Sequence, residues 1–128
     1  MISPDGSRVA YSDRGADPGI HVLPTSGGTP GKISGARTSS WGWSPDGNTL
    51  LFRAGPGETA EIWSAHLPTG KTMPLLRHEK YSLFQSVYSA DGQWLAVFAG
   101  TPPPSWPRIF IVRLHDGVPD PGLPWVPI

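Results

Sequence analysis

The stretch "WGWSPDGNTLLF", Trp41 to Phe52, places a Ser-Pro-Asp-Gly turn between a pair of tryptophans and an apolar run. The same phrase occurs near the start of the chain as "ISPDGSRVAYS" (residues 2–12) and returns as "YSADGQWLAVF" (residues 88–98). Proline fixes φ at the second position of a turn, aspartate bonds back to the local backbone, and glycine takes the left-handed position that follows. Each phrase therefore predicts a hairpin corner between two strands.

The three corners belong to a longer repeat. Their aspartates, Asp5, Asp46 and Asp91, are 41 and 45 residues apart, which is the range of four-stranded propeller blades. A short β-rich segment follows each corner: "VAYS" (9–12), "TLLFR" (49–53) and "WLAVFA" (94–99). A further segment begins with an Ile and ends in a turn glycine: "GIHVLPTSGG" (19–28), "EIWSAHLPTG" (61–70) and "RIFIVRLHDG" (108–117). The period and the strand composition predict an all-β chain.

Inner and outer strands complete each predicted blade. The inner strand is "SSWGW" (39–43) or "LFQSVY" (83–88), and only Met1 and Ile2 stand at that position in the first repeat. Outer strands are predicted at "TPGKI" (29–33), "KTMPLL" (71–76) and "LPWVPI" (123–128), where proline suits an edge. We therefore predict one domain, residues 1–128, forming a β-propeller of four-stranded antiparallel blades at about 1–37, 38–80 and 81–128.

Composition limits the function. The 128 residues contain ten basic and ten acidic side chains, so no net charge favours nucleic acid as a partner. Sixteen glycines and sixteen prolines suit a β protein rich in turns, and the absence of cysteine excludes disulfides and thiol chemistry. No signal peptide is recognisable at the start, and no apolar run approaches the roughly 20 residues that cross a bilayer. We expect no membrane insertion and a cytoplasmic location by default.

At these motifs the chain resembles the TolB-type, WD-like β-propeller repeats. It is especially similar to the bacterial arrays attached to signalling proteins, where phrases such as "GIYVVP…GG" and "W-[IV]-P-[IV]" are common; here they read "GIHVLPTSGG" and "WVPI". The third repeat departs at Ala90, where proline is expected. The resemblance implies a recognition or scaffolding propeller, compatible also with a periplasmic location, and such repeats also form the non-catalytic propeller of prolyl-oligopeptidase-like peptidases.

The sequence contains no motif for catalysis. A serine hydrolase of the peptidase type needs G-x-S-x-G, and a phosphate loop needs GxxxxGK[ST]; neither pattern occurs. The four histidines are scattered without metal-ligand spacing, and the corner aspartates are expected to be used by their turns. We expect no catalytic residue, no metal, no cofactor and no enzymatic activity.

Loops provide the candidate binding residues. Arg37, Arg77, His78 and Tyr81 lie in connections between an outer strand and the next inner strand, where they could converge on a channel mouth and contact an anionic or peptide group. Trp106 lies in the stiff loop "GTPPPSWPR" (100–108) and is a candidate for a protein contact.

Three functions are compatible with these observations. The first is a non-catalytic propeller module for protein interaction or scaffolding. The second is a sensor or ligand-binding propeller of a signalling protein such as a kinase, and the third is the propeller part of a peptidase. Because closed propellers have about four to eight blades, three blades leave two open flanks. We therefore expect self-association, with two chains forming a six-bladed homodimer.

Overall fold

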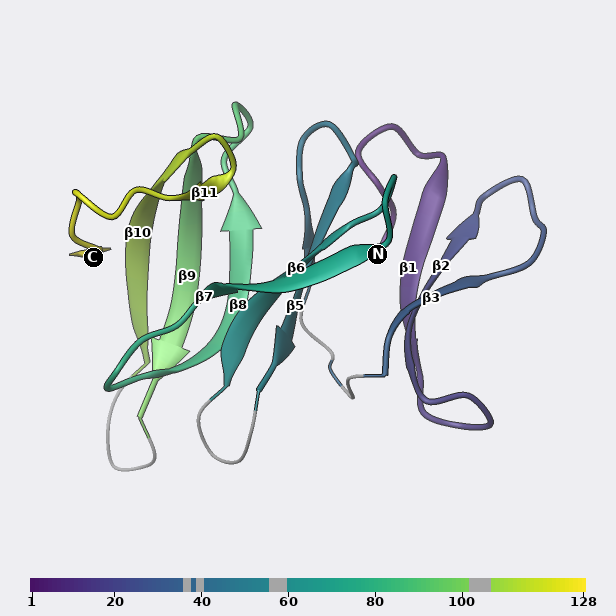
Figure 1. Ribbon diagram of the computed structural model, residues 1–128, viewed down its shortest axis with the longest axis horizontal. Coiled ribbons are helices and arrows are strands. Elements are labelled where there is room, and N and C mark those ends of the chain that lie inside the picture. Colours follow the sequence, from purple (N-terminus) through teal and green to yellow (C-terminus); the bar gives the residue numbers. More distant parts are fainter. Residues whose placement is uncertain (36–37, 39–40, 56–59, 102–106) are drawn as a thin grey trace.

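The computed structural model describes residues 1–35, 38, 41–55, 60–101 and 107–128, and its regular structure is all β (Figure 1). In this part of the chain no helix has the length and apolar character needed to cross a membrane. The strands form three separate antiparallel sheets that follow one another along the chain. The prediction of an all-β chain built from consecutive propeller blades is confirmed.

We call the three sheets blades 1, 2 and 3. Blade 1 contains β1 (Arg8–Asp13), β2 (Gly19–Pro24) and β3 (Gly31–Ser34). Blade 2 contains β4 (Trp41–Trp43), β5 (Thr49–Ala54), β6 (Glu61–His66) and β7 (Lys71–Leu76). Blade 3 contains β8 (Ser82–Tyr88), β9 (Trp94–Gly100) and β10 (Arg108–His115), together with the short strands β11 (Val118–Pro119) and β12 (Val126–Pro127). Within each blade, strands adjacent in sequence pair from the inner to the outer edge.

Two blades differ from the predicted four strands. Blade 1 has three strands in the described residues, and the place of an inner strand is held by an isolated bridge between Ile2 and Val9. The terminal ammonium of Met1 donates to the Ala10 carbonyl at 2.7 Å beside this bridge. In blade 3 the predicted outer strand over 123–128 is confirmed only at β12, which pairs with Phe110 and Ile111, while β11 pairs with the last two residues of β10. The chain between them is rich in proline, which has no N–H to donate to a strand ladder.

The Ser-Pro-Asp-Gly phrase forms the predicted hairpin corner. In blade 2 the Gly47 N–H donates to the Ser44 carbonyl at 2.9 Å, and Gly47 has a φ of 72°. One carboxylate oxygen of Asp46 accepts from the Ser44 hydroxyl at 2.6 Å and from the Asn48 N–H at 2.9 Å. The Ser44 oxygen in turn accepts from the Thr49 N–H at 2.9 Å. The serine and the aspartate thus fix both sides of the corner.

The other two corners repeat this network. Asp5 accepts from the hydroxyl of Ser3 at 2.8 Å, and Asp91 accepts from the hydroxyl of Ser89 at 2.5 Å. The corner of blade 3 retains these bonds although Ala90 stands where the others have proline. Proline is therefore dispensable for the geometry, because side-chain hydrogen bonds hold the turn.

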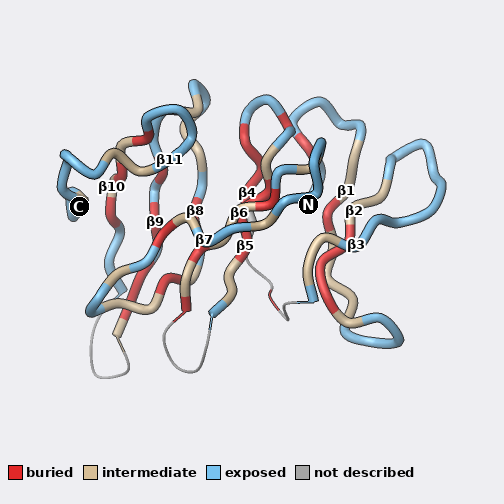
Figure 2. Tube along the Cα trace, viewed as in Figure 1, coloured by how far each residue is buried: buried red, intermediate tan, exposed pale blue. Residues whose placement is uncertain are grey.

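The core lies between neighbouring blades (Figure 2). One cluster joins blades 1 and 2 and contains Ala10, Ile20, Trp43, Leu50, Phe52 and Ala65. The other joins blades 2 and 3 and contains Leu51, Ile62, Leu76, Leu83, Leu95, Val97, Ala99, Phe110, Val112 and Leu114. Neighbouring residues of β5 therefore enter different clusters, because successive strand side chains point to opposite faces. Trp43 of β4 is buried between blades 1 and 2, with 8% of its surface exposed.

The inner strands of blades 2 and 3 approach closely at Gly42. A Cβ at this position would lie 2.6 Å from the backbone oxygen of Ser86 on β8. Only glycine permits this separation without a backbone shift. The contact sets how near the two blades stand at their inner edges.

Candidate functional site

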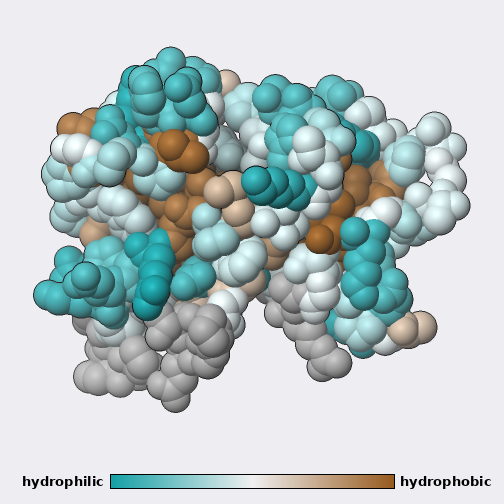
Figure 3. All heavy atoms as spheres, in the orientation of Figure 1, coloured by the Kyte–Doolittle hydropathy of each residue, from teal (hydrophilic) through white to brown (hydrophobic). Residues whose placement is uncertain are grey.

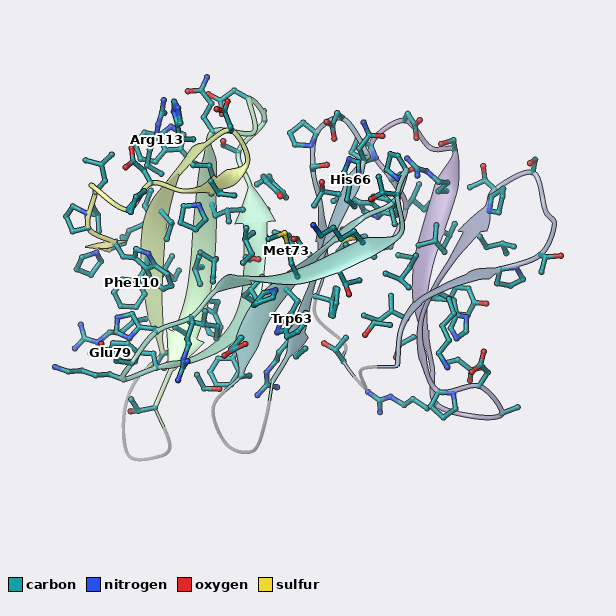
Figure 4. The ribbon with its side chains drawn as sticks, in the orientation of Figure 1. Trp63, His66, Met73, Glu79, Phe110 and Arg113 are labelled. Atoms are coloured by element: carbon teal, nitrogen blue, oxygen red, sulfur yellow. The ribbon has the colours of Figure 1, made fainter. Side chains whose placement is uncertain are left out.

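Three of the predicted loop residues lie around an aromatic cluster on the outer side of blade 3. The ring of His78 lies 4.8 Å from Tyr81, 5.5 Å from Phe110 and 5.3 Å from Trp125, measured between centroids. Phe110 is on β10 (Figure 4), and Trp125 directly precedes β12. His78 and Tyr81 lie in the loop after β7, and both rings contact Phe110 on β10, so this loop packs against blade 3.

A small hollow accompanies this cluster. It has a volume of about 360 Å³ and is lined by Arg77, His78, Glu79, Lys80, Phe110 and Trp125. The Arg77 side chain is largely exposed, and its Nε lies 3.8 Å from a Glu61 carboxylate oxygen. The lining carries the cations of Arg77 and Lys80 and the carboxylate of Glu79. The other two predicted binding residues, Arg37 and Trp106, lie outside the described residues.

Sequence reasoning missed two members of the cluster. Phe110 was assigned only to a strand, and Trp125 only to an outer edge strand. The alternation of β10 could have indicated that Phe110 faces blade 2, since Phe110, Val112 and Leu114 are all buried. No sequence signal links His78 to Trp125.

A larger hollow of about 670 Å³ lies between blades 2 and 3 at the side of the hairpin corners. Hydrophobic atoms gather in the space between β7 and β11 (Figure 3), and Figure 4 labels His66 and Met73 on the strands beside it. Its border includes Asp46 and Asp91, and Tyr88 also lines it. Burial raises the pKa of Tyr88 to about 12, so its hydroxyl stays protonated at neutral pH.

The corner aspartates remain charged because their turns bind the carboxylate form. Hydrogen bonds from the backbone and side chain of Ser7 lower the pKa of Asp5 to about 2. The Ser44 hydroxyl lowers the pKa of Asp46, and the Ser89 hydroxyl lowers that of Asp91. These carboxylates are used by the fold, as predicted from the turn chemistry. No group of three or more His, Cys, Asp or Glu side chains in the described part of the chain could hold a metal ion.

Several exposed apolar side chains lie together on the face of blade 3 that points away from blade 2. We call it the forward face; it carries Val87 on β8, Trp94, Ala96 and Phe98 on β9, and Ile109 on β10. Val87 is 52% exposed, while Phe98 and Ile109 are each 41% exposed. The register pairs Phe98 with Ile109, so their side chains lie next to each other on this face.

Blade 2 has the same face, and there it is covered. Aligned on the corner aspartates, Ala96 takes the position of Leu51, and aligned on the third strand, Ile109 takes the position of Ile62. Leu51 and Ile62 are each 1% exposed because blade 3 packs on them. The forward face of blade 3 is therefore an interblade surface without its neighbour.

Blade 1 carries the complementary open surface, which we call the rear face. It carries the exposed Ile2 and the half-buried Val9, Tyr11 and Leu23, and His21 lies buried beneath Tyr11. Tyr11 stacks on His21 with 5.4 Å between ring centroids. The Nε2 atom of His21 is 2.9 Å from the Asp17 carbonyl, and the side chain of Asp17 binds Lys32. These contacts hold Tyr11 in a defined position.

Comparison with known proteins supports the fold assignment. No family model and no curated protein matches the sequence. Among solved structures, one described as TolB from Agrobacterium tumefaciens matches with a TM-score of 0.71 and 32% identity, over 91% of this chain and 42% of that one. TolB from Acinetobacter baumannii matches with a TM-score of 0.71 and 24% identity, over 91% of this chain and 29% of that one.

A peptidase propeller also matches. Prolyl oligopeptidase B from Galerina marginata, in its apo form, has a TM-score of 0.71 and 21% identity, over 98% of this chain and 21% of that one. The chain therefore spans less than half the length of each of these three structures. Fold and matches together define a β-propeller segment. It is of the TolB type, as the repeated corner phrases indicated.

Proposed function

We propose that this chain is a non-catalytic propeller module for protein interaction, and that it closes by self-association into a six-bladed homodimer. The observation that carries the proposal is the exposed forward face of blade 3, whose equivalent in blade 2 is buried. Large apolar patches are uncommon on soluble monomers and mark interaction surfaces. A second copy supplies the complementary surface, because its blade 1 presents an apolar rear face.

The closed arrangement satisfies both open surfaces of each chain. Blade 3 of one copy packs on blade 1 of its partner, and the two-fold axis repeats the contact. From the usual spacings of strands and residues, a face of four strands and five residues covers on the order of 300 Å² in projection, and the three-stranded face of blade 1 covers about 240 Å². The two contacts of the closed dimer thus involve about 1,100 Å² of protein surface in projection, counting both partners.

Light scattering over a concentration series tests the proposal. The parent chain is expected to have a mass near twice 13.7 kDa, whereas Phe98→Asp should remain near 13.7 kDa because the charge enters the contact. Met73→Asp is the matched control, since Met73 is similarly exposed, at 44%, but lies on β7 away from both faces. A parent chain that is monomeric throughout, or a dimer unaffected by Phe98→Asp, would refute the homodimer.

The matches to peptidase propellers favour one alternative, in which this segment is the non-catalytic propeller of a larger peptidase. A coding sequence that continues into a domain with G-x-S-x-G would support that alternative. A neighbouring kinase or transmembrane segment would instead support a sensor propeller.

A further inference from the structure

The forward face of blade 3 has a specific depression. It has a volume of about 180 Å³ and is lined by Gln85, Val87, Ala96, Phe98 and Ile109. Ala96 is the smallest of these side chains, and the other two blades place Ala10 and Leu51 at the same position relative to the corner aspartate. The depth of the forward face thus varies between blades with the size of this one residue.

In both covered interfaces the residue at this position belongs to the same cluster as the residue six places after the corner aspartate of the next blade, and the two differ in size. Between blades 1 and 2, Ala10 shares a cluster with Phe52 of the next blade. Between blades 2 and 3, the larger Leu51 shares a cluster with the smaller Val97. Close packing requires such compensation, because a void or an overlap at an interface costs stability.

Ala96 is the third residue at this position, and no neighbouring blade in the described part of the same chain covers it. Ala96 leaves the depression, and the residue of blade 1 that corresponds to Phe52 and Val97 is Tyr11. We propose that Tyr11 of a second copy inserts into the depression at Ala96, since Tyr11 takes the position of Phe52, which shares a cluster with Ala10. This inference rests on the proposed homodimer and names the contact that determines which faces pair.

The chemistry of the depression suits tyrosine. A buried phenolic hydroxyl needs a hydrogen-bond partner, and Gln85 on the border of the depression carries an amide that can both donate and accept. The stacking of Tyr11 on His21 already restricts its ring before association. An ordered side chain loses less conformational entropy when it is buried.

Val87 also favours blade 1 as the neighbour. Val87 stands at the position that Gly42 has in blade 2. At Gly42 the inner strand of the next blade approaches so closely that a Cβ would lie 2.6 Å from the backbone oxygen of Ser86. A complete inner strand could not approach Val87 in that way. In the described residues the inner edge of blade 1 carries only the Ile2–Val9 bridge, which leaves room for the larger side chain.

A size exchange tests the inference on the full chain. Ala96→Leu fills the depression, so the dimer dissociation constant measured by sedimentation should rise roughly tenfold or more through overpacking. Adding Tyr11→Val to Ala96→Leu recreates the Leu51–Val97 combination and should recover most of the affinity. Circular dichroism and thermal unfolding of the monomers check that each variant folds, since Ala96 is exposed and Tyr11 is half-buried in the single chain.

The outcomes separate this inference from the homodimer itself. If the parent chain dimerises but Ala96→Leu binds equally well, or if Tyr11→Val fails to restore affinity, the insertion of Tyr11 is wrong and the homodimer stands. If the parent chain never associates, both proposals fail and the two faces belong to other blades.

Discussion

The forward faces of blades 2 and 3 are built from corresponding residues but have opposite exposure. Leu51 and Ile62 of blade 2 are buried, whereas Ala96 and Ile109 of blade 3 are open to solvent. Ile62 and Ile109 are the same residue type, so the difference arises from the presence or absence of a neighbouring blade. The comparison teaches that the sequence of blade 3 is suited to a packed interface that the single chain does not form.

The largest loss of stability is expected when the covered forward face of blade 2 is given the residue found on the exposed forward face of blade 3. Leu51→Ala places in blade 2 the residue that blade 3 has at Ala96, and it leaves a cavity in the cluster that joins blades 2 and 3. The free energy of unfolding should fall by about 2–5 kcal/mol, as for other buried Leu to Ala changes. Urea unfolding provides the measurement, and a loss below about 1 kcal/mol would mean that this interface is not a core.

A smaller loss is expected when the close approach of the inner strands is prevented. Gly42→Ala places a Cβ 2.6 Å from the Ser86 oxygen, so blades 2 and 3 must separate locally. Overpacking of this kind costs about 1–3 kcal/mol. Gly31→Ala is the control, because its nearest neighbour, the Val22 oxygen, would be 3.9 Å away. Equal melting temperatures for the two variants would contradict the role assigned to Gly42.

The hairpin corners predict a pH dependence shared by all three blades. The folded-state pKa of Asp5 is about 2, and those of Asp46 and Asp91 are also lowered. Their contribution is present above the unfolded pKa of about 4 and is lost as pH falls toward the folded values. Urea midpoints should therefore decrease between about pH 4 and pH 2.

Asparagine variants isolate this effect. Asn at positions 5, 46 and 91 keeps an oxygen acceptor but does not titrate in this range. The triple variant should lose less stability than the parent chain between the same pH values. Parallel pH profiles for the two proteins would show that these carboxylates do not control acid unfolding.

The smallest expected effect concerns the one corner without proline. Ala90→Pro should stabilise the chain by about 0.4–1 kcal/mol, because the corner at Ser44 has the same hydrogen bonds with proline in place. Thermal unfolding measures the gain. A lower melting temperature would mean that the backbone at Ala90 differs from that at Pro45.

Local chemistry made the corners and strands predictable. Ser44, Asp46 and Gly47 determine a turn through their own hydrogen bonds and conformations, so the sequence alone was sufficient there. The outer edge of blade 3 was less predictable, because prolines interrupt its pairing with β10 after two residues at each end. The unpaired segment between β11 and β12 depends on which residues of β10 remain available for pairing, and local propensity does not determine this.

Contacts between distant residues could not be inferred in advance. His78 was chosen as a loop residue, but its contact with Trp125 depends on the paths of two irregular segments. The repeat aligns Ala96 with Ala10 and Leu51, and it aligns Tyr11 with Phe52 and Val97. Which of these positions share an interblade cluster depends on the packing of the blades, which the repeat alone does not determine.

Mixing two complementary variants tests the central claim most directly. Phe98→Asp disables the forward face of blade 3, and Tyr11→Lys disables the rear face of blade 1, so each variant alone should be monomeric. Combined in equal amounts, they form one intact contact, between blade 3 of the Tyr11→Lys chain and blade 1 of the Phe98→Asp chain, while the second contact brings opposite charges together at positions 98 and 11. Light scattering should then detect a one-to-one complex near twice 13.7 kDa. If the mixture remains at 13.7 kDa while the parent chain dimerises, the pairing of blade 3 with blade 1 is contradicted.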